Sequence, residues 1–263
     1  MLRKLLKYDL NYMIRNMSVF YILIIFFSIL TRIFFSLEQT IIIGILSQIS
    51  VGFLFAFVAN ILINTIMRSW VRFSNSIYKD EAYLTHTLPV TKNDIYNSKF
   101  IQTLIFFVIG FVIILVSLFI TYYTKDRWFA LKGLISNIIN GLEINTLTFV
   151  IAIIGILFVE IFNAIQCGFL GIILGNRRNN NKLLFSVIFG ILSYFISQGL
   201  VLFLVFIFGL FNKGIMNLFT SNLMMDVDTF KLFIFLVIII YLLIIVFMSV
   251  VCKYMLNKGV NLE

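Results

Sequence analysis

The chain has 263 residues, of which 62% are hydrophobic and only 12% are charged. A soluble protein of this length needs more polar residues to cover its surface, so the composition indicates an all-α integral membrane protein. The net charge of +9 does not point to a nucleic-acid partner, because the basic residues separate apolar runs and form no basic domain.

The first seventeen residues are too polar to cross a bilayer, but they have the pattern of an amphipathic helix. Apolar residues recur at three- and four-residue spacing from Leu2 through Ile14 to Met17, so they share one helical face. Basic residues such as Lys4 fall on the other face. We expect an interfacial helix over residues 1–17, held by apolar burial and by anionic membrane lipid. A merely basic leader is the alternative.

Six apolar runs are each long enough for the roughly 20 helical residues that a bilayer crossing needs. We place the spans at about residues 18–37, 41–67, 100–123, 144–175, 183–211 and 230–252. Helices are expected because lipid cannot satisfy the backbone groups of open strand edges. Residues 1–263 are therefore interpreted as a single transmembrane domain.

Lysine and arginine are divided unevenly between the two sides of these spans. Fourteen of the twenty lie in the N-terminal segment, in the loops after spans two and four, and in the C-terminal tail. The positive-inside rule places these fourteen in the cytoplasm. Both termini are then expected in the cytoplasm, as an even number of spans requires.

The stretch "SIYKDEAYLTHTLPVTKND", residues 76–94, separates spans two and three and holds the only proline and the only histidine of the chain. We expect Asn75 or Ser76 to cap the start of a short helix in this loop. That helix must stop near Thr87, because Pro89 disfavours helical geometry in the residue before it.

A second helix start follows directly, since Thr91 and Asp94 have the spacing of a capping box that leads into span three. The loop is thus predicted to be a compact cytoplasmic unit on two spans. Its apolar residues include Ile77, Tyr78, Tyr83, Leu84 and Leu88. These are poor choices for a surface that faces only water, so we favour a partner that covers them over a plain solvated connector.

The run "YKDEAYLTHTLPVTKNDIYNSKF" resembles the cytoplasmic loop of ABC-2 type transporter permeases. In that family an acidic residue, a helix with Leu and Thr, and an "LPV" or "TPV" motif lie between the second and third spans. The expected layout of interfacial helix, six spans and internal termini is also similar. The chain looks most like small permeases of low-GC Gram-positive bacteria. One departure is Glu81-Ala82, because many members have Gly before the Leu-rich helix.

The resemblance implies the membrane subunit of a bacterial ATP-binding cassette exporter, multi-pass in the plasma membrane, with a lipophilic or peptide cargo. It implies pairing with a second copy or a sister permease, and a coupling helix that docks on a separate ATPase subunit. Carried over by position, the residues at the ATPase would be Tyr78, Lys79, Asp80, Glu81, Tyr83, Leu84, His86, Thr87, Leu88, Pro89, Arg177 and Arg178.

The sequence has no Walker A motif, the glycine-rich phosphate-binding loop that ends in Lys-Ser/Thr. We therefore expect no cofactor on this chain, with ATP and magnesium bound by the partner ATPase. His86 is the only histidine and has no cysteine beside it, so a zinc site is not expected. No nucleophile with an adjacent base is evident, and we expect that the chain is not an enzyme.

Polar residues inside two spans are candidates for a substrate pathway. Glu160, Asn163 and Gln166 recur at three-residue spacing in span four, and Asn60 and Asn64 share a face of span two. Such groups usually face the protein interior or a wet cavity. They could line a pathway or join helices by hydrogen bonds. For span four we favour the joining of helices.

Small residues also recur on two spans. Gly171 and Gly175 form a GxxxG pattern in span four, and span five has a stripe of small residues at Ser186, Gly190, Ser193 and Ser197. Small residues let helix backbones approach closely, so these predict tight contacts within the bundle or at a dimer seam.

Two further hypotheses stay open. The chain could be a membrane interaction or immunity protein that binds a toxin or peptide without transporting it. It could also be an intramembrane enzyme that uses Glu160 or His86. An isolated gene without an ATPase gene beside it would favour the first of these two.

Overall fold

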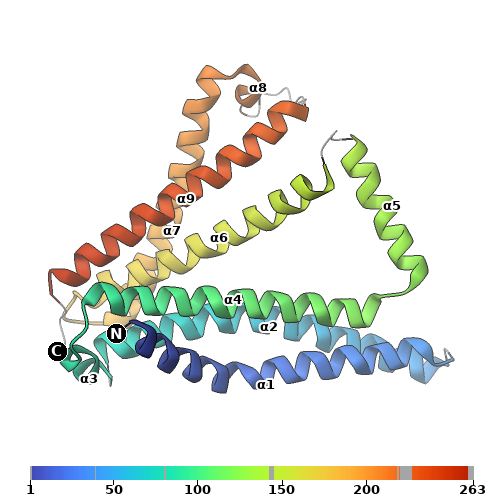
Figure 1. Cartoon of the computed structure of the whole chain (residues 1–263), viewed down its shortest axis with the longest axis horizontal. Helices are drawn as coiled ribbons and strands as arrows, with labels where there is room; N and C mark the ends of the chain where they lie inside the picture. Colours follow the sequence, from blue (N-terminus) through green and yellow to red (C-terminus); the bar gives the residue numbers. More distant parts are fainter. Residues whose placement is uncertain are drawn as a thin grey trace. The chain divides into compact units, whose positions relative to one another are not determined.

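The computed structural model describes residues 2–38, 40–79, 81–141, 145–217, 219 and 227–259. Every regular element in these residues is a helix (Figure 1). The helices are α1 (Leu2–Ser36), α2 (Ile41–Tyr78), α3 (Ala82–Thr87), α4 (Lys92–Tyr122), α5 (Lys125–Gly141), α6 (Thr146–Gly175), α7 (Lys182–Phe211), α8 (Lys213–Met216) and α9 (Val227–Asn257). The described part of the chain contains no strand, and the predicted all-helical class is confirmed.

Six helices are long and apolar enough to cross a membrane, namely α1, α2, α4, α6, α7 and α9. Each has 30 to 38 residues, and only 17–33% of its most apolar window is buried within the chain. Apolar surface left exposed on this scale is what lipid-facing helices present. The prediction of six helices of membrane-spanning length and composition is confirmed.

The N-terminal residues do not form an element of their own, because α1 runs without a break from Leu2 to Ser36. They are helical, as expected, and part of their apolar face packs on the protein itself. Met13 and Met17 are fully buried in a cluster with Phe106 of α4. Ile14, assigned to the same face, is 53% exposed.

Two more helices extend past the predicted spans: α2 continues to Tyr78, and α4 begins at Lys92. The prediction ended these spans near the first charges, yet residues 68–78 contain no glycine or proline that would break a helix. At about 1.5 Å per residue, the 38 residues of α2 measure about 57 Å, against roughly 30 Å of bilayer hydrocarbon. A large part of α2 therefore stands outside the hydrocarbon.

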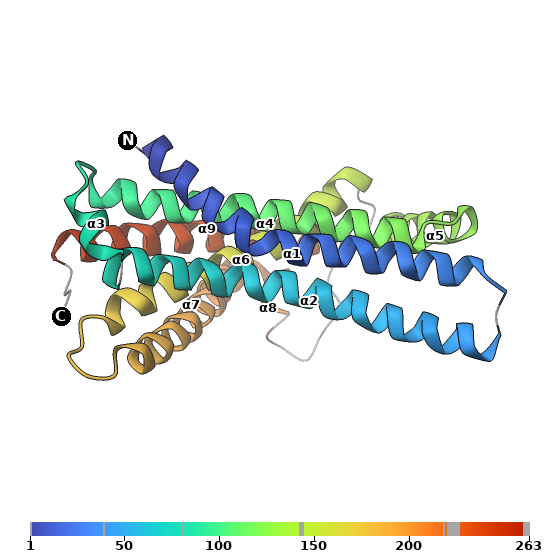
Figure 2. The same cartoon turned by 90° about the horizontal axis from the view of Figure 1, so that it is seen from below.

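Contacts between Cα atoms divide the chain into two compact units, Met1–Leu131 and Lys132–Glu263. In unit 1, α1 packs against α2 and α4, and these two also pack on each other. The three helices run side by side in both views (Figure 2). Ile24, Ile61 and Ile114, one from each helix, form a buried cluster at their contact.

In unit 2, α6 packs against both α7 and α9. The contact with α7 is close, because a Cβ at Gly171 would lie 2.5 Å from the Gly190 Cα. Gly175 meets Ser186 just as closely. The two predicted small-residue stripes therefore face each other, and the tight contact lies within the chain.

The long connection after span three forms α5, which has no buried residue. The helix exposes Trp128, Phe129 and Leu134 beside charged residues of its first turn, a mixed surface of the kind that interfacial helices have.

Candidate functional site: α3 and the charged cluster

The connection between α2 and α4 contains the short helix α3 and follows the prediction in its second half. α3 ends at Thr87, before Leu88 takes an extended conformation ahead of Pro89. Thr91 caps α4, since its side-chain oxygen accepts a hydrogen bond of 3.1 Å from the Asp94 backbone N–H. The predicted helix stop and helix start are both confirmed.

The predicted start of this helix is wrong. Asn75 and Ser76 lie inside α2, and Ser76 is buried there. α3 begins only at Ala82, after Glu81, which makes no capping hydrogen bond. The cause is the same continuation of α2 through residues 68–78 that the prediction missed.

α3 has two different faces. Ala82 and Thr85 are buried, whereas Tyr83 is 71% and Leu84 68% exposed, and Leu88 just beyond the helix is 41% exposed. The buried face comes from side chains small enough to let α3 pack on α2. The exposed face is apolar, and none of the residues that the structure describes covers it.

The other predicted residues of this connection are placed as follows. Lys79, Thr87 and Pro89 are exposed, and Tyr78, Glu81 and His86 are half-buried, while Asp80 lies outside the described residues. A ring nitrogen of His86 lies 3.2 Å from the Ile77 carbonyl oxygen of α2. Ile77 is 1% exposed, so it belongs to the core and not to the surface where we expected it.

Behind α3 lies a charged cluster formed by Asp9, Arg72, Glu81 and Lys99. The Asp9 carboxylate is fully buried. It accepts hydrogen bonds from Arg72 Nε at 3.1 Å and Nη2 at 3.0 Å, from Lys99 Nζ at 2.5 Å, and from Ser98 Oγ at 2.8 Å. One side chain of α1 thereby joins α2 and α4.

Arg72 connects this cluster to α3. Its Nη1 donates to both carboxylate oxygens of Glu81, at 2.6 and 2.7 Å. The guanidinium also lies over the rings of Tyr12 and Tyr8, at 4.5 and 5.1 Å from their centroids. Two cations and two carboxylates balance each other, as charges removed from water must. The cluster fixes the start of α3 to three membrane-length helices.

The charged cluster was not predicted from the sequence, where Arg72 and Lys99 counted only among the basic residues of the loop after span two. One signal was present in the sequence. Asp9 interrupts the apolar stripe of the N-terminal helix between Leu6 and Met13, and it is the only acidic residue before Glu38. A carboxylate at such a position requires buried cationic partners.

The polar residues of α6 bind neighbouring helices. Glu160 Oε1 accepts hydrogen bonds from Tyr194 Oη at 2.7 Å and from Gln198 Nε2 at 2.8 Å, both on α7. Gln198 Oε1 in turn accepts one from Tyr241 of α9 at 2.8 Å. Four side chains of three helices are thus joined in one chain of hydrogen bonds.

Two further polar residues of α6 make similar contacts. Asn163 donates to Ser197 of α7 at 2.8 Å, and Gln166 donates to Ser249 of α9 at 2.9 Å. The contacts are those expected of residues that join helices. In α2, by contrast, Asn64 donates to the Asn60 side chain of its own helix.

Arg177 and Arg178 lie in the connection between α6 and α7 and are exposed. Arg177 Nη2 donates to the Met255 carbonyl oxygen at 2.9 Å. The Arg178 guanidinium lies 5.6 Å from the Phe185 ring centroid. Both arginines thus contact other residues of unit 2, to which they belong.

Within the described ranges, no group of three or more His, Cys, Asp or Glu residues could hold a metal ion. The structure therefore defines an all-helical protein with six helices suited to a membrane, a short amphipathic helix between two of them, and a buried charged cluster. No family model, curated protein or solved structure matches the chain.

Proposed function

We propose that this chain is the membrane subunit of an ATP-binding cassette transporter and that α3 is its docking helix for a separate ATPase subunit. The observation that carries the proposal is the exposed apolar face of α3, formed by Tyr83, Leu84 and Leu88. Protein–protein interfaces are apolar at their centre, and α3 presents an apolar surface of this kind between two membrane-length helices.

The anchoring of α3 supports this role mechanically. The Glu81–Arg72 pair fixes the residue just before α3, and the His86 contact with Ile77 fixes its last turn. The capping residue of α4, Thr91, follows four positions after the end of α3. A displacement of α3 by a partner is therefore passed to α2 and α4. Through Asp9, it also reaches α1.

The rest of the proposal follows the resemblance to ABC-2 type permeases. The protein spans the bacterial plasma membrane with both termini and α3 in the cytoplasm, and it pairs with a second copy or a sister permease. ATP and magnesium are bound by the ATPase, and the transported cargo is a lipophilic compound or a peptide. Asn60 and Asn64, which are half-buried, are the pathway candidates that bind no other helix in the hydrogen bonds described above.

The experiment is co-purification from the native host with a tag on this chain. The unmodified chain should bring down a polypeptide with a Walker A motif and ATP hydrolysis activity. L84D/L88D should lose both, because two carboxylates on the exposed face oppose an apolar contact. Since these leucines are 68% and 41% exposed, the change leaves the fold intact.

A matched control is L131D/L134D on α5, where the leucines are 47% and 66% exposed. It should keep both the ATPase and its activity. If L84D/L88D keeps the ATPase as well, α3 is not the docking helix. If the unmodified chain never carries an ATPase but retains a toxin or peptide, the protein is an interaction protein instead.

A further inference from the structure

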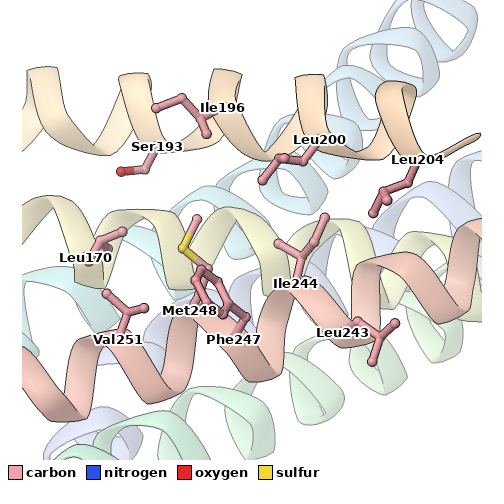
Figure 3. Close-up of a pocket in the computed structure, with 10 residues that line it drawn as sticks. All are labelled: Leu170, Ser193, Ile196, Leu200, Leu204, Leu243, Ile244, Phe247, Met248 and Val251. Carbon is pink, nitrogen blue, oxygen red and sulfur yellow. The ribbon is translucent and has the colours of Figure 1, made fainter. Parts of the chain in front are cut away.

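Unit 2 has an apolar groove of about 380 Å³ between α7 and α9, with α6 at its floor. Nine of its ten lining residues are apolar, and the tenth is Ser193. Figure 3 shows the two helices on either side, with Leu200 pointing from α7 and Phe247 belonging to α9. Ile196 and Phe247 are 53% and 64% exposed, so the groove opens on the surface.

The three helices around the groove all have membrane-spanning length and composition, so we expect the groove to lie at the level of the bilayer hydrocarbon. Its length along α9, from Leu243 to Val251, is about 12 Å at roughly 1.5 Å per residue. One leaflet provides about 15 Å of hydrocarbon, half of the roughly 30 Å of a bilayer. The groove thus has the length and the polarity that suit one lipid acyl chain.

Basic residues continue both walls of the groove at one end. On α7, Lys182, Phe185, Phe189 and Ser193 follow each other at three- and four-residue spacing, so Lys182 lies on the groove face of that helix. The same spacing recurs along α9 and just past its end, at Phe247, Val251, Tyr254 and Lys258.

Two of the cations at this end lie on aromatic rings of these stripes. Arg178 is over Phe185, and Lys258 Nζ is 4.7 Å from the Tyr254 ring centroid. Aromatic and basic residues together are typical of the level of lipid headgroups. The cations therefore lie on the stripes that continue the groove walls past its end.

Within the described residues, no ion pair joins a carboxylate to Arg178, Lys182 or Lys258. The sequence has no acidic residue between Glu160 and Asp226, and none between Asp228 and Glu263. In unit 1, by contrast, the buried cations Arg72 and Lys99 are both paired with the Asp9 carboxylate. Among the described residues the cations at the end of the groove have no acidic partner, so they are available to an anion from outside the chain.

We propose that the groove between α7 and α9 binds one anionic phospholipid of the surrounding bilayer. An acyl chain lies along Leu200 and Phe247, and the phosphate is bound by Arg178, Lys182 and Lys258. The site is distinct from α3, and it does not depend on the proposed transport function.

The test uses the full-length F247W variant in bilayer nanodiscs of phosphatidylglycerol and phosphatidylcholine with identical chains. Either one or the other lipid carries brominated acyl chains, which quench nearby tryptophan. Quenching of the introduced tryptophan is taken as the difference from the unmodified protein, which has two tryptophans of its own. Brominated phosphatidylglycerol should quench more than brominated phosphatidylcholine at the same mole fraction.

The same measurement in the R178Q/K182Q/K258Q background isolates the headgroup contacts. Each cation near an anionic surface strengthens binding about fivefold, so the preference for phosphatidylglycerol should fall by more than about tenfold. The matched control, R3Q/K4Q/K7Q, removes three exposed cations from α1 and should keep the preference. Equal quenching by both lipids, or an equal loss in the control, overturns the proposal.

A second measurement needs no substitution and serves if a variant does not fold. Phosphatidylglycerol with a photoreactive acyl chain is cross-linked to the unmodified protein, and the labelled peptides are identified. Labels should gather in residues 193–204 and 243–251, and excess phosphatidylglycerol, but not phosphatidylcholine, should remove them. Labels spread evenly over α1 and α2 would contradict the site.

Discussion

Arg72 Nη1 lies 2.6 and 2.7 Å from the two carboxylate oxygens of Glu81, so one guanidinium ties the first turn of the α3 connection to α2. The same side chain binds Asp9 of α1. α3 is therefore not a loose loop but a short helix held at its start by a charge pair. This relationship makes the charged cluster the part of the molecule whose substitution is most informative.

Asp9→Asn is expected to destabilise the protein strongly. The carboxylate is fully buried and compensates both Arg72 and Lys99, and loss of one partner in such a site typically costs about 3–5 kcal/mol. Denaturation in detergent should show the loss as a lower midpoint of unfolding. D126N, on the exposed surface of α5, should change the midpoint little. Equal midpoints for the two variants would mean that the buried cations find other partners.

Glu81→Gln should act locally. It weakens the anchor of α3 but leaves Asp9 to balance Arg72, and Glu81 is itself 34% exposed. We expect faster amide hydrogen exchange in residues 82–87 and a smaller loss of overall stability than for D9N. E38Q, at a fully described and exposed glutamate outside the cluster, should leave this exchange unchanged. Unaltered exchange in E81Q would show that the Glu81–Arg72 pair does not hold α3.

Gly171→Ala and Gly199→Ala should have opposite effects. The new Cβ at position 171 meets the Gly190 backbone, whereas a Cβ at position 199 meets nothing within 4 Å. Overpacking of this kind costs about 1–3 kcal/mol, but alanine in an open helical position gains up to about 1 kcal/mol over glycine. Thermal unfolding in detergent measures both. A stabilising G171A would contradict the close contact of α6 with α7.

Glu160→Gln and Glu160→Leu separate the two interpretations of this residue. Glutamine keeps an oxygen that can accept from Tyr194 and Gln198, whereas leucine removes both hydrogen bonds. Interhelical hydrogen bonds in membranes contribute about 0.6 kcal/mol each and at most about 1.7. E160L should therefore lose roughly 1–2 kcal/mol, and E160Q should lose less. If E160Q keeps stability but abolishes transport, the carboxylate charge serves the pathway.

The sequence predicted the helical class, the six spans and the cap at Thr91, because each depends on local signals. Apolar runs fix the spans, and a threonine three residues before an aspartate fixes the start of α4. Tight helix contacts at the small-residue stripes of Gly171 and Gly190 were also predicted, although not that the two stripes face each other, since small residues at helical spacing have few other uses. These features need no knowledge of which helices are neighbours.

The charged cluster could not be found in the same way. Asp9 and Arg72 are 63 positions apart, and Asp9 and Lys99 are 90 apart, so only the packing of α1 against α2 and α4 brings them together. The late end of α2 was missed for a different reason. Residues 68–78 are charged and polar enough to resemble a loop, but Ser69, Arg72 and Ser76 lie at helical spacing on one buried face.

The central claim is that α3 contacts an ATPase, and the most direct measurement is site-specific cross-linking. A photoreactive amino acid is placed at Leu84, which is 68% exposed, and for comparison at Leu134 of α5, which is 66% exposed. After illumination of native-host membranes, the cross-linked products are identified by mass spectrometry. If α3 contacts an ATPase, position 84, and not position 134, should capture a polypeptide with a Walker A motif. Capture of only lipid or of this chain at position 84 would contradict it.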